Sequence, residues 1–215
     1  MISLYQYTTA TRSLSDSVEI AEFMREVGFR CIGINGLPRT LHALSGFRTS
    51  LPSNIAHLLS SSPSRSLTAS AVEATKTAGR TLWTSIHRPL DILLGSKLGT
   101  AHPDLPGFAM DYLYGGLFSD VDTITGVKLG RLNMSLFAIA CLRAQQGTEA
   151  QLVGHLLGLK KAWDTWDKCP YTESEEAVNW LKSDQGCFWT LRTVDDLAIA
   201  LGQGRRPKIA LTPKL

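Results

Sequence analysis

The stretch that decides the fold is Gly130–Trp163, "GRLNMSLFAIACLRAQQGTEAQLVGHLLGLKKAW". Nearly every residue from Leu136 to Leu142 is apolar, and a helix that is apolar on nearly all sides must be buried all round. A glycine-containing break, "AQQG", ends this helix. The part that follows, "TEAQLVGHLLGLKKAW", carries leucines at helical spacing, with a histidine, His155, among them. The stretch therefore predicts two consecutive core helices.

Helical patterns fill most of the remaining chain. Residues 17–33 carry an apolar stripe that Asp16 or Ser17 is expected to cap, and Pro38 suits the first turn of the next helix. Residues 70–99 are predicted to be helical with a break at His87-Arg88-Pro89. The other expected helices are an aromatic one at 108–118 with Pro106 in its first turn, one at 171–182 with Ser174 near its start, and a last one at 193–201. Only "CFWTL", residues 187–191, hints at β-alternation, so the predicted fold class is all-α.

Length and composition favour one domain. The chain has 215 residues, of which 44% are hydrophobic, which is enough for one substantial core. We expect this core to span about residues 17–201, with a Ser-rich loop at 60–70 and a flexible tail at 202–215. The net charge of +3 is too mild to indicate nucleic-acid binding, and no apolar run reaches the roughly 18 residues of a membrane span.

The sequence favours a reducing, cytoplasmic setting. None of the four cysteines forms a C-x-x-C pair, and the N-terminus lacks the pattern of a secretory signal. Two weaker targeting signals remain as alternatives. The C-terminal Pro-Lys-Leu matches the peroxisomal Ser-Lys-Leu at two of three positions, and the Ser/Thr-rich N-terminus with Arg12 has some mitochondrial character.

The two halves of the chain share one pattern: a long apolar helix, a glycine break and a second helix. Residues 23–51 align with the stretch quoted above when Gly36 is set against Gly147. In this register Leu44 stands opposite His155. The pattern predicts two pseudo-repeated helical hairpins, and it indicates that the fold itself does not require a histidine at position 155.

The chain resembles the AhpD-like, or carboxymuconolactone decarboxylase-like, superfamily, and most of all a fungal branch of it. The resemblance is carried by "CIGINGLPRTLHALSGFRTSLP", "AHPDLP", "YGGLF" and the stretch Gly130–Trp163, with "WLKSDQGCFW" and "VDDLAIAL". These segments cover most of residues 17–200. The resemblance implies an all-helical fold that commonly assembles into homo-oligomers.

The chain departs from the thiol-peroxidase pattern of that superfamily, C-x-x-C-x-x-x-H on a helix N-terminus with a glutamate upstream. When the pattern is set on His155, Thr148 and Gln151 stand where the cysteines would be, and Asn133 or Ser135 stands near the glutamate. A helix N-terminus activates a thiol but not a Thr hydroxyl or a Gln amide. Thr148-x-x-Gln151 is instead typical of a capping box. We therefore expect no disulfide-based peroxidase chemistry.

His155 is the first candidate catalytic residue, as a neutral, partly buried general base or acid. The alternative is a core histidine that is bonded to a carbonyl or hydroxyl. Arg39 and Arg131 each open a predicted helix, where the dipole disfavours a cation, so each is expected to have an acidic partner or to orient a substrate anion. Tyr114 is a candidate acid for an oxyanion, or a core aromatic residue.

The predicted substrate-binding set adds Gln151, Tyr112, His102 and Trp163. His102 also fits a simple turn with Pro103 and Asp104, and His87 is expected in a loop. No two histidines have the i, i+4 spacing of a helical metal site, so no metal and no cofactor are expected.

Three functional hypotheses follow. The first is a cofactor-independent enzyme that performs proton transfer on a small, largely apolar metabolite: isomerisation, decarboxylation, or ring opening or closure. Its expected setting is the degradative or secondary metabolism of a fungus. The second is a non-catalytic helical module for ligand binding or oligomerisation. A third and weaker one is peroxide chemistry through a lone cysteine. The expected partners are a small-molecule substrate and other copies of the chain, with no nucleic acid and no membrane.

Overall fold

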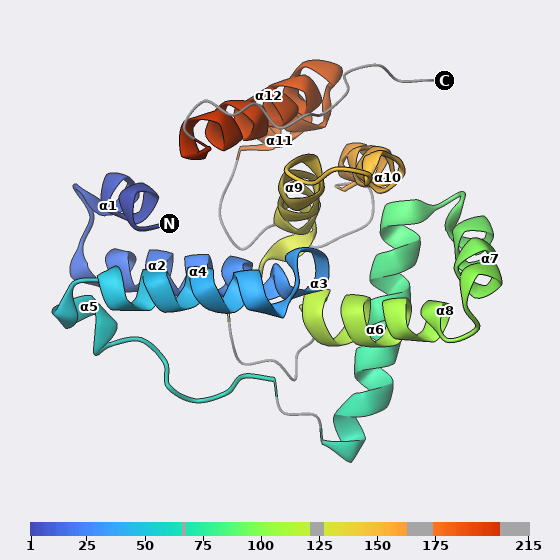
Figure 1. Cartoon of the computed structure of the whole chain (residues 1–215), viewed down its shortest axis with the longest axis horizontal. Coiled ribbons are helices and arrows are strands. Elements are labelled where there is room, and N and C mark those ends of the chain that lie inside the picture. Colours follow the sequence, from blue (N-terminus) through green and yellow to red (C-terminus); the bar gives the residue numbers. More distant parts are fainter. Residues whose placement is uncertain (66–67, 121–126, 163–173, 203–215) are drawn as a thin grey trace. The chain divides into compact units, whose positions relative to one another are not determined.

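The computed structural model describes residues 1–65, 68–120, 127–162 and 174–202. Within these residues the chain forms helices and no strand, which confirms the all-α fold class (Figure 1). None of the described helices combines the length and the apolar composition needed to cross a membrane.

The chain divides into two compact units. The first comprises Met1–Arg80 and Gly107–Leu129, and the second Thr81–Pro106 and Gly130–Leu215. The first unit contains α1 (Ile2–Thr9), α2 (Leu14–Arg30), α3 (Ile32–Asn35), α4 (Leu37–Ser50), α5 (Ser53–Ala56), the start of α6 (Ala69–His87) and a π-helix, η1 (Phe108–Phe118). The second contains the end of α6, α7 (Asp91–Ala101), most of α8 (Leu105–Gly107), α9 (Gly130–Arg143), α10 (Glu149–Lys160), α11 (Glu175–Lys182) and α12 (Asp184–Leu201). Whether both units form the single predicted domain stays a prediction.

The first unit is built on α2, which contacts α1, α4 and α5 (Figure 1). Its core includes Tyr5, whose ring meets that of Phe47 edge to face at 5.9 Å between centroids. Tyr5 lies on α1, before the predicted start of the core at residue 17. The N-terminal residues are therefore part of this core.

Helix α6 and η1 approach each other through glycines. A Cβ built on Gly79 would lie 2.1 Å from the Met110 carbonyl oxygen, and one on Gly115 would lie 2.5 Å from the Thr75 carbonyl oxygen. Neither distance leaves room for a side chain. The sequence predicted a helix at 108–118 but not its π geometry, which is seen where the Ser119 N–H donates to the Tyr114 carbonyl at 2.9 Å.

The second unit is built on α9, whose burial on nearly all sides confirms the prediction from its composition. Helices α10 and α12 both contact α9, and α11 contacts α12 (Figure 1). At the end of α9, the Arg143 guanidinium donates two hydrogen bonds to the Asp195 carboxylate, at 2.8 and 2.6 Å. This bidentate pair joins α9 to α12.

Two local predictions are wrong. Ser13 caps α2, not Asp16 or Ser17: its hydroxyl accepts from the Asp16 N–H at 3.1 Å, so the helix begins earlier than its apolar stripe. The segment "CFWTL" is not a strand but lies inside α12. Its buried residues, Cys187 and Thr190, are three apart, which is helical spacing.

Other boundaries are confirmed. Pro38 lies in the first turn of α4, Ser174 caps α11, and the break after His87 separates α6 from α7. The aligned glycines Gly36 and Gly147 both have left-handed φ, at 83° and 76°, immediately before α4 and before the N-cap of α10. The pseudo-repeat of hairpins as a whole stays a prediction.

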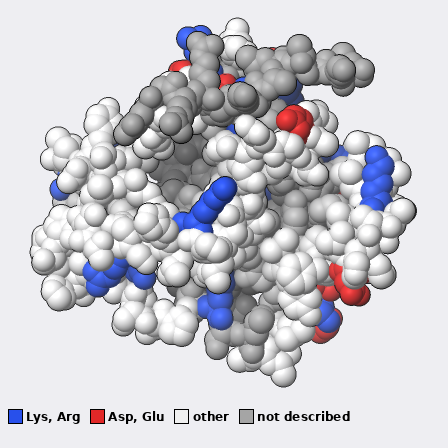
Figure 2. All heavy atoms as spheres, viewed as in Figure 1, with Lys and Arg blue, Asp and Glu red and all other residues white. Residues whose placement is uncertain are grey.

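Charged side chains are dispersed on the described part of the face that Figure 2 shows. In Figure 2, Lys and Arg side chains are separated by uncharged ones and do not merge into a continuous basic area. This agrees with the mild net charge of +3.

Candidate functional site

His155 lies on α10 and packs against a second histidine. Its ring meets that of His87, the last residue of α6, edge to face at 5.5 Å between centroids. The Trp83 ring, one turn earlier on α6, lies 4.2 Å from the His87 ring. His87 was predicted to lie in a loop, and this is wrong: the helix continues through it and ends only before the Arg88-Pro89 bond. We call His87 and His155 the imidazole pair.

Glycines on α10 permit the close approach of α6. A Cβ on Gly154 would lie 3.7 Å from the His87 ring, in ordinary contact, whereas one on Gly158 would lie 2.9 Å from Ile86 Cγ2. The "GHLLG" segment thus places His155 between two small residues that face the end of α6. Larger side chains at 158 would push the two helices, and with them the two rings, apart.

Arg131 stands at the start of α9 and is 6% exposed. Its Nε donates to the Ser85 hydroxyl at 3.0 Å, and its Nη2 donates to the carbonyls of Gly158 at 2.9 Å and Ser85 at 3.3 Å. Its Nη1 donates a short hydrogen bond to the Ser135 hydroxyl. The guanidinium therefore ties α6, α9 and α10 together around the imidazole pair.

Lys161, just after α10, caps the end of α6. Its ammonium donates to the carbonyls of Ile86 at 2.8 Å and Arg88 at 2.5 Å. A cation at a helix C-terminus satisfies carbonyls that have no partner within the helix and is favoured by the helix dipole. Burial, followed by the charges of Arg131 and Arg88, lowers the pKa of Lys161.

Both imidazoles are neutral at physiological pH. Burial, aided by the neighbouring His87 and by Arg131, lowers the pKa of His155 to about 3. Burial, aided by Lys161 and Arg131, lowers the pKa of His87 to about 4, and Asp91 opposes this shift. The cause is common to both: an imidazolium here would lose its hydration and face positive charges.

A neutral imidazole pair has defined chemical abilities. Each ring offers one N–H donor and one acceptor nitrogen. A neutral imidazole with a lowered pKa is a good hydrogen-bond donor to a carbonyl but a weak base. Nearby cations favour an anion that develops beside the rings. The arrangement therefore fits the polarisation of a carbonyl group better than the outright removal of a proton by a strong base.

The start of α10 is not a capping box. Thr148 is the N-cap residue, but its side chain makes no capping hydrogen bond; its hydroxyl donates backwards to the Leu142 carbonyl at 2.8 Å. Gln151, the other predicted member, is exposed. The hydroxyl closes the turn between α9 and α10, because the end of α9 offers it an unsatisfied carbonyl acceptor.

The structure distributes the other predicted site residues over both units. Arg131, Gln151 and His102 belong with His155 to the second unit, and Tyr114, Tyr112 and Arg39 belong to the first. His102 is exposed and accepts from the Asp104 N–H at 3.2 Å, as the predicted turn requires. Trp163 lies outside the described residues.

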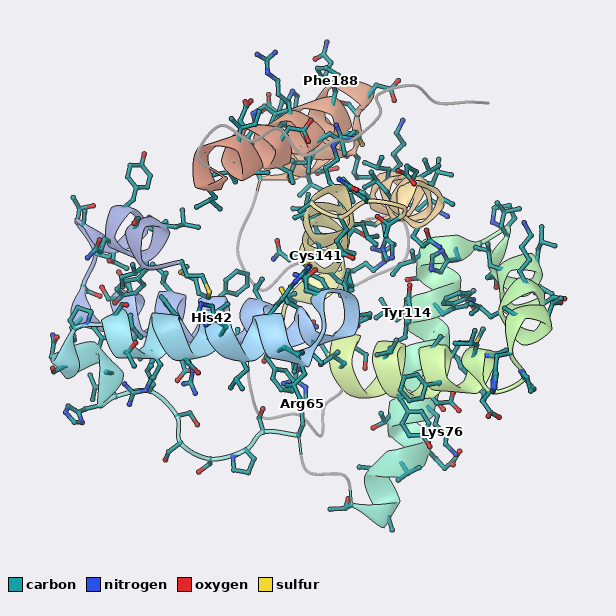
Figure 3. All side chains as sticks on the ribbon, in the orientation of Figure 1. His42, Arg65, Lys76, Tyr114, Cys141 and Phe188 are labelled. Carbon is teal, nitrogen blue, oxygen red and sulfur yellow. The ribbon has the colours of Figure 1, made fainter. Side chains whose placement is uncertain are left out.

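The first-unit candidates differ in burial. Tyr114 lies on η1 (Figure 3). It is buried and meets Phe118 edge to face at 5.5 Å between centroids, whereas Tyr112 is 63% exposed. Arg39 is exposed on α4 and makes no hydrogen bond or ion pair with a described residue, contrary to the expected acidic partner. Their predicted roles in a site stay predictions.

Sequence reasoning missed three members of the site: His87, Trp83 and Lys161. The signal for the first two was present, because Trp83 and His87 are four residues apart in "TLWTSIH", which is helical spacing. Pro89, however, predicted a break in the helix that included His87, so His87 was expected in a loop. Nothing in the sequence indicated that Lys161 would cap a helix more than 70 residues away.

Two of the described cysteines, Cys141 and Cys187, are buried. Cys187 is buried, and this burial raises the pKa of its thiol. A raised pKa leaves less of the nucleophilic thiolate at neutral pH. Among the described residues, no three His, Cys, Asp or Glu side chains gather in the geometry of a metal site.

No protein-family model matches the chain, and no curated protein and no solved structure matches it significantly. The function is therefore argued from the site.

Proposed function

We propose that this protein is a cofactor-independent enzyme of AhpD-like fold that performs proton-transfer chemistry on a small, largely apolar organic molecule. The observation that carries the proposal is the imidazole pair: two buried neutral rings, 5.5 Å apart, beside a buried arginine. The reaction classes that suit it are isomerisation, decarboxylation, and ring opening or closure. Each passes through an enolate-like anion that donors and cations stabilise.

The burial of these polar groups supports a functional role. Apolar side chains would fill the same core without the desolvation penalty that imidazole and guanidinium groups incur. The aligned position in the first half is occupied by Leu44, so helix packing alone does not call for His155. Such locally unfavourable choices concentrate at functional sites.

In this proposal one ring of the imidazole pair donates its N–H to the substrate carbonyl, and the unprotonated nitrogen of the other ring accepts the proton that leaves carbon and returns it to the product. The Arg131 charge stabilises the developing oxyanion. Because the pKa of His155 is about 3, His155 acts through its neutral form, as donor or as weak acceptor. The contributions of Gln151, His102 and Trp163 to substrate binding remain part of the proposal.

A non-catalytic ligand-binding or oligomerisation module is the second candidate, and one observation favours it. His155 is only 6% exposed and Arg131 donates four hydrogen bonds within the unit, so both side chains also serve packing. A module of this kind would bind small molecules without changing them. The raised pKa of Cys187 makes that thiol a poor nucleophile for peroxide chemistry.

Assembly and location complete the proposal. We infer a homo-oligomer from the exposed apolar residues of α12, among them Phe188 and Trp189. We infer a cytoplasmic location from the cysteine usage. The peroxisome and the mitochondrion are the alternatives, and imaging of tagged chains distinguishes the three locations.

The test is a screen for carbon–deuterium exchange. Wild-type protein is incubated in D2O with cyclic enones, 1,3-diketones and unsaturated lactones, and proton NMR follows the loss of the signals next to the carbonyl. The enzyme proposal predicts accelerated exchange for at least one class. Binding of these compounds without any exchange would establish the module instead.

A further inference from the structure

The first unit contains a cavity that the imidazole pair does not use. Its volume is about 950 Å³, within the upper range of small-molecule sites. One face of α2 and one face of α4 form part of its lining, and the segment from Leu58 to Arg65 forms another part. In Figure 3, Arg65 lies beside the α2–α4 pair.

The lining combines apolar and basic side chains. Its apolar members are Val18, Phe29, Leu44, Leu58 and Val127, and its charged members are Arg25, Arg48, Arg65, Glu22 and Glu26. Three arginines and two glutamates leave one net positive charge. A ligand with an apolar body and one acidic group complements such a surface.

Both glutamates are already occupied. The Glu26 carboxylate accepts from the buried Arg30 at 2.6 Å and from Arg65 at 3.1 Å. The Glu22 carboxylate accepts from Arg25 at 3.0 Å and from the Ser60 N–H at 2.6 Å. These carboxylates are therefore poor sites for a ligand cation, and they do not repel an anion as isolated charges would.

Two arginines of the lining have a hydrogen-bond donor or a charge that no described residue pairs. The Nε–H of Arg65 is buried and donates to no described residue, while the guanidinium lies over the Phe29 ring at 4.8 Å from its centroid. An unsatisfied buried donor is destabilising, so it calls for an acceptor. Arg48 is exposed and makes no ion pair with a described residue.

We propose that this cavity binds an amphiphilic organic acid: its carboxylate accepts from Arg65 and Arg48, and its apolar body lies along α2 and α4. This site is independent of the imidazole pair and does not require that pair to be catalytic. A carboxylate satisfies the orphaned Arg65 donor, and the net positive lining discriminates against neutral and cationic molecules of equal length.

The experiment compares three probes that differ only in the head group: octanoate, octan-1-ol and octylammonium, each titrated into the full chain by isothermal calorimetry. The expected result is an octanoate affinity at least about tenfold above that of octan-1-ol, corresponding to about 1.4 kcal/mol, and weaker binding still of octylammonium. Equal affinities for octanoate and octan-1-ol, or no octanoate binding at millimolar concentration, would overturn the proposal.

Two variants locate the site. Ser45→Trp adds bulk at an exposed lining position and is expected to abolish octanoate binding, and Arg48→Gln is expected to weaken it about tenfold. Thr49→Trp, on the same helix but outside the lining, and Arg12→Gln, an exposed arginine of the same unit, are the matched controls. Circular dichroism checks that all four fold. Loss of binding in the controls, or unchanged binding in both lining variants, places octanoate elsewhere and overturns the assignment.

Discussion

His155 and His87 are uncharged at neutral pH because the protein interior offers their imidazolium forms neither water nor an adequate anion. Their pKa values of about 3 and about 4 lie below the ordinary value of 6.5. A group whose pKa is lower in the folded state than in the unfolded state links stability to pH.

This linkage has a definite sign. Above pH 6.5 both states are neutral and the histidines do not affect the pH dependence. Below pH 6.5 the two histidines bind protons in the unfolded chain but stay neutral in the folded chain. The free energy of unfolding therefore decreases as the pH falls from about 6.5 towards 3–4. Between pH 7 and pH 5 we expect a loss of about 2 kcal/mol for each buried histidine, at about 1.4 kcal/mol per pKa unit.

Urea unfolding at both pH values measures this loss. The double variant His87→Gln, His155→Gln should show a much flatter pH dependence than wild type, whatever its absolute stability. The matched double variant His42→Gln, His102→Gln removes two exposed histidines and should keep the wild-type slope. Parallel slopes for all three proteins would show that the two buried histidines titrate normally.

The sequence predicted one side chain of the imidazole pair and missed the other. His155 stood out because a helical core pattern does not require it. His87 did not, because its contact with His155 spans 68 positions and depends on where α6 ends. A nearby proline predicts a break, but not on which side of the break a residue lies.

Helices α6 and η1 are held together by backbone contact at two glycines. A methyl group on Gly79 or Gly115 would overlap carbonyl oxygens of the opposite helix, whereas one on Gly116 meets nothing within 4 Å. Neighbouring glycines on η1 therefore have opposite tolerance for a side chain.

We predict that Gly115→Ala and Gly79→Ala each destabilise the protein by about 1–3 kcal/mol, because overlap with backbone atoms is relieved only by moving a helix. Gly116→Ala, one residue from Gly115, should leave stability within about 1 kcal/mol of wild type. Thermal unfolding of the three variants measures this. A Gly115→Ala protein as stable as Gly116→Ala would contradict the close helix contact.

Element boundaries followed the sequence wherever a local signal was strong. Helix α9 follows from its apolar run, and the starts of α4 and α11 follow from Pro38 and Ser174. Each of these signals acts on residues that are close to it in the sequence. The π-helix η1 and the core role of α1 were missed, because each depends on packing against distant residues. Gly115 in particular has a role that only its partner, Thr75, reveals.

Exposed apolar residues on α12 bear on whether copies of the protein associate. Phe188 is 66% exposed and Trp189 is 51% exposed, and the Trp180 ring packs against Trp189 at 5.5 Å between centroids. Adjacent exposed aromatic residues of this size are typical of protein contact surfaces.

The proposed homo-oligomer predicts that sedimentation velocity detects assemblies of wild-type protein at micromolar concentration. Phe188→Glu with Trp189→Glu should shift the protein to monomer, because charges cannot be buried unpaired in an interface. Gln185→Glu adds a charge to α12 without removing an apolar side chain and should leave the assembly largely intact. A wild-type monomer at all concentrations would refute the assembly.

The role of the imidazole pair is tested by the rate of deuterium incorporation into the compound of the exchange screen that exchanges fastest. We predict that His155→Gln, folded by circular dichroism, exchanges at least about 100-fold more slowly than wild type, as removal of a proton-transfer group entails. His42→Gln should exchange at the wild-type rate. An unchanged rate in folded His155→Gln would show that His155 moves no proton and serves the core alone.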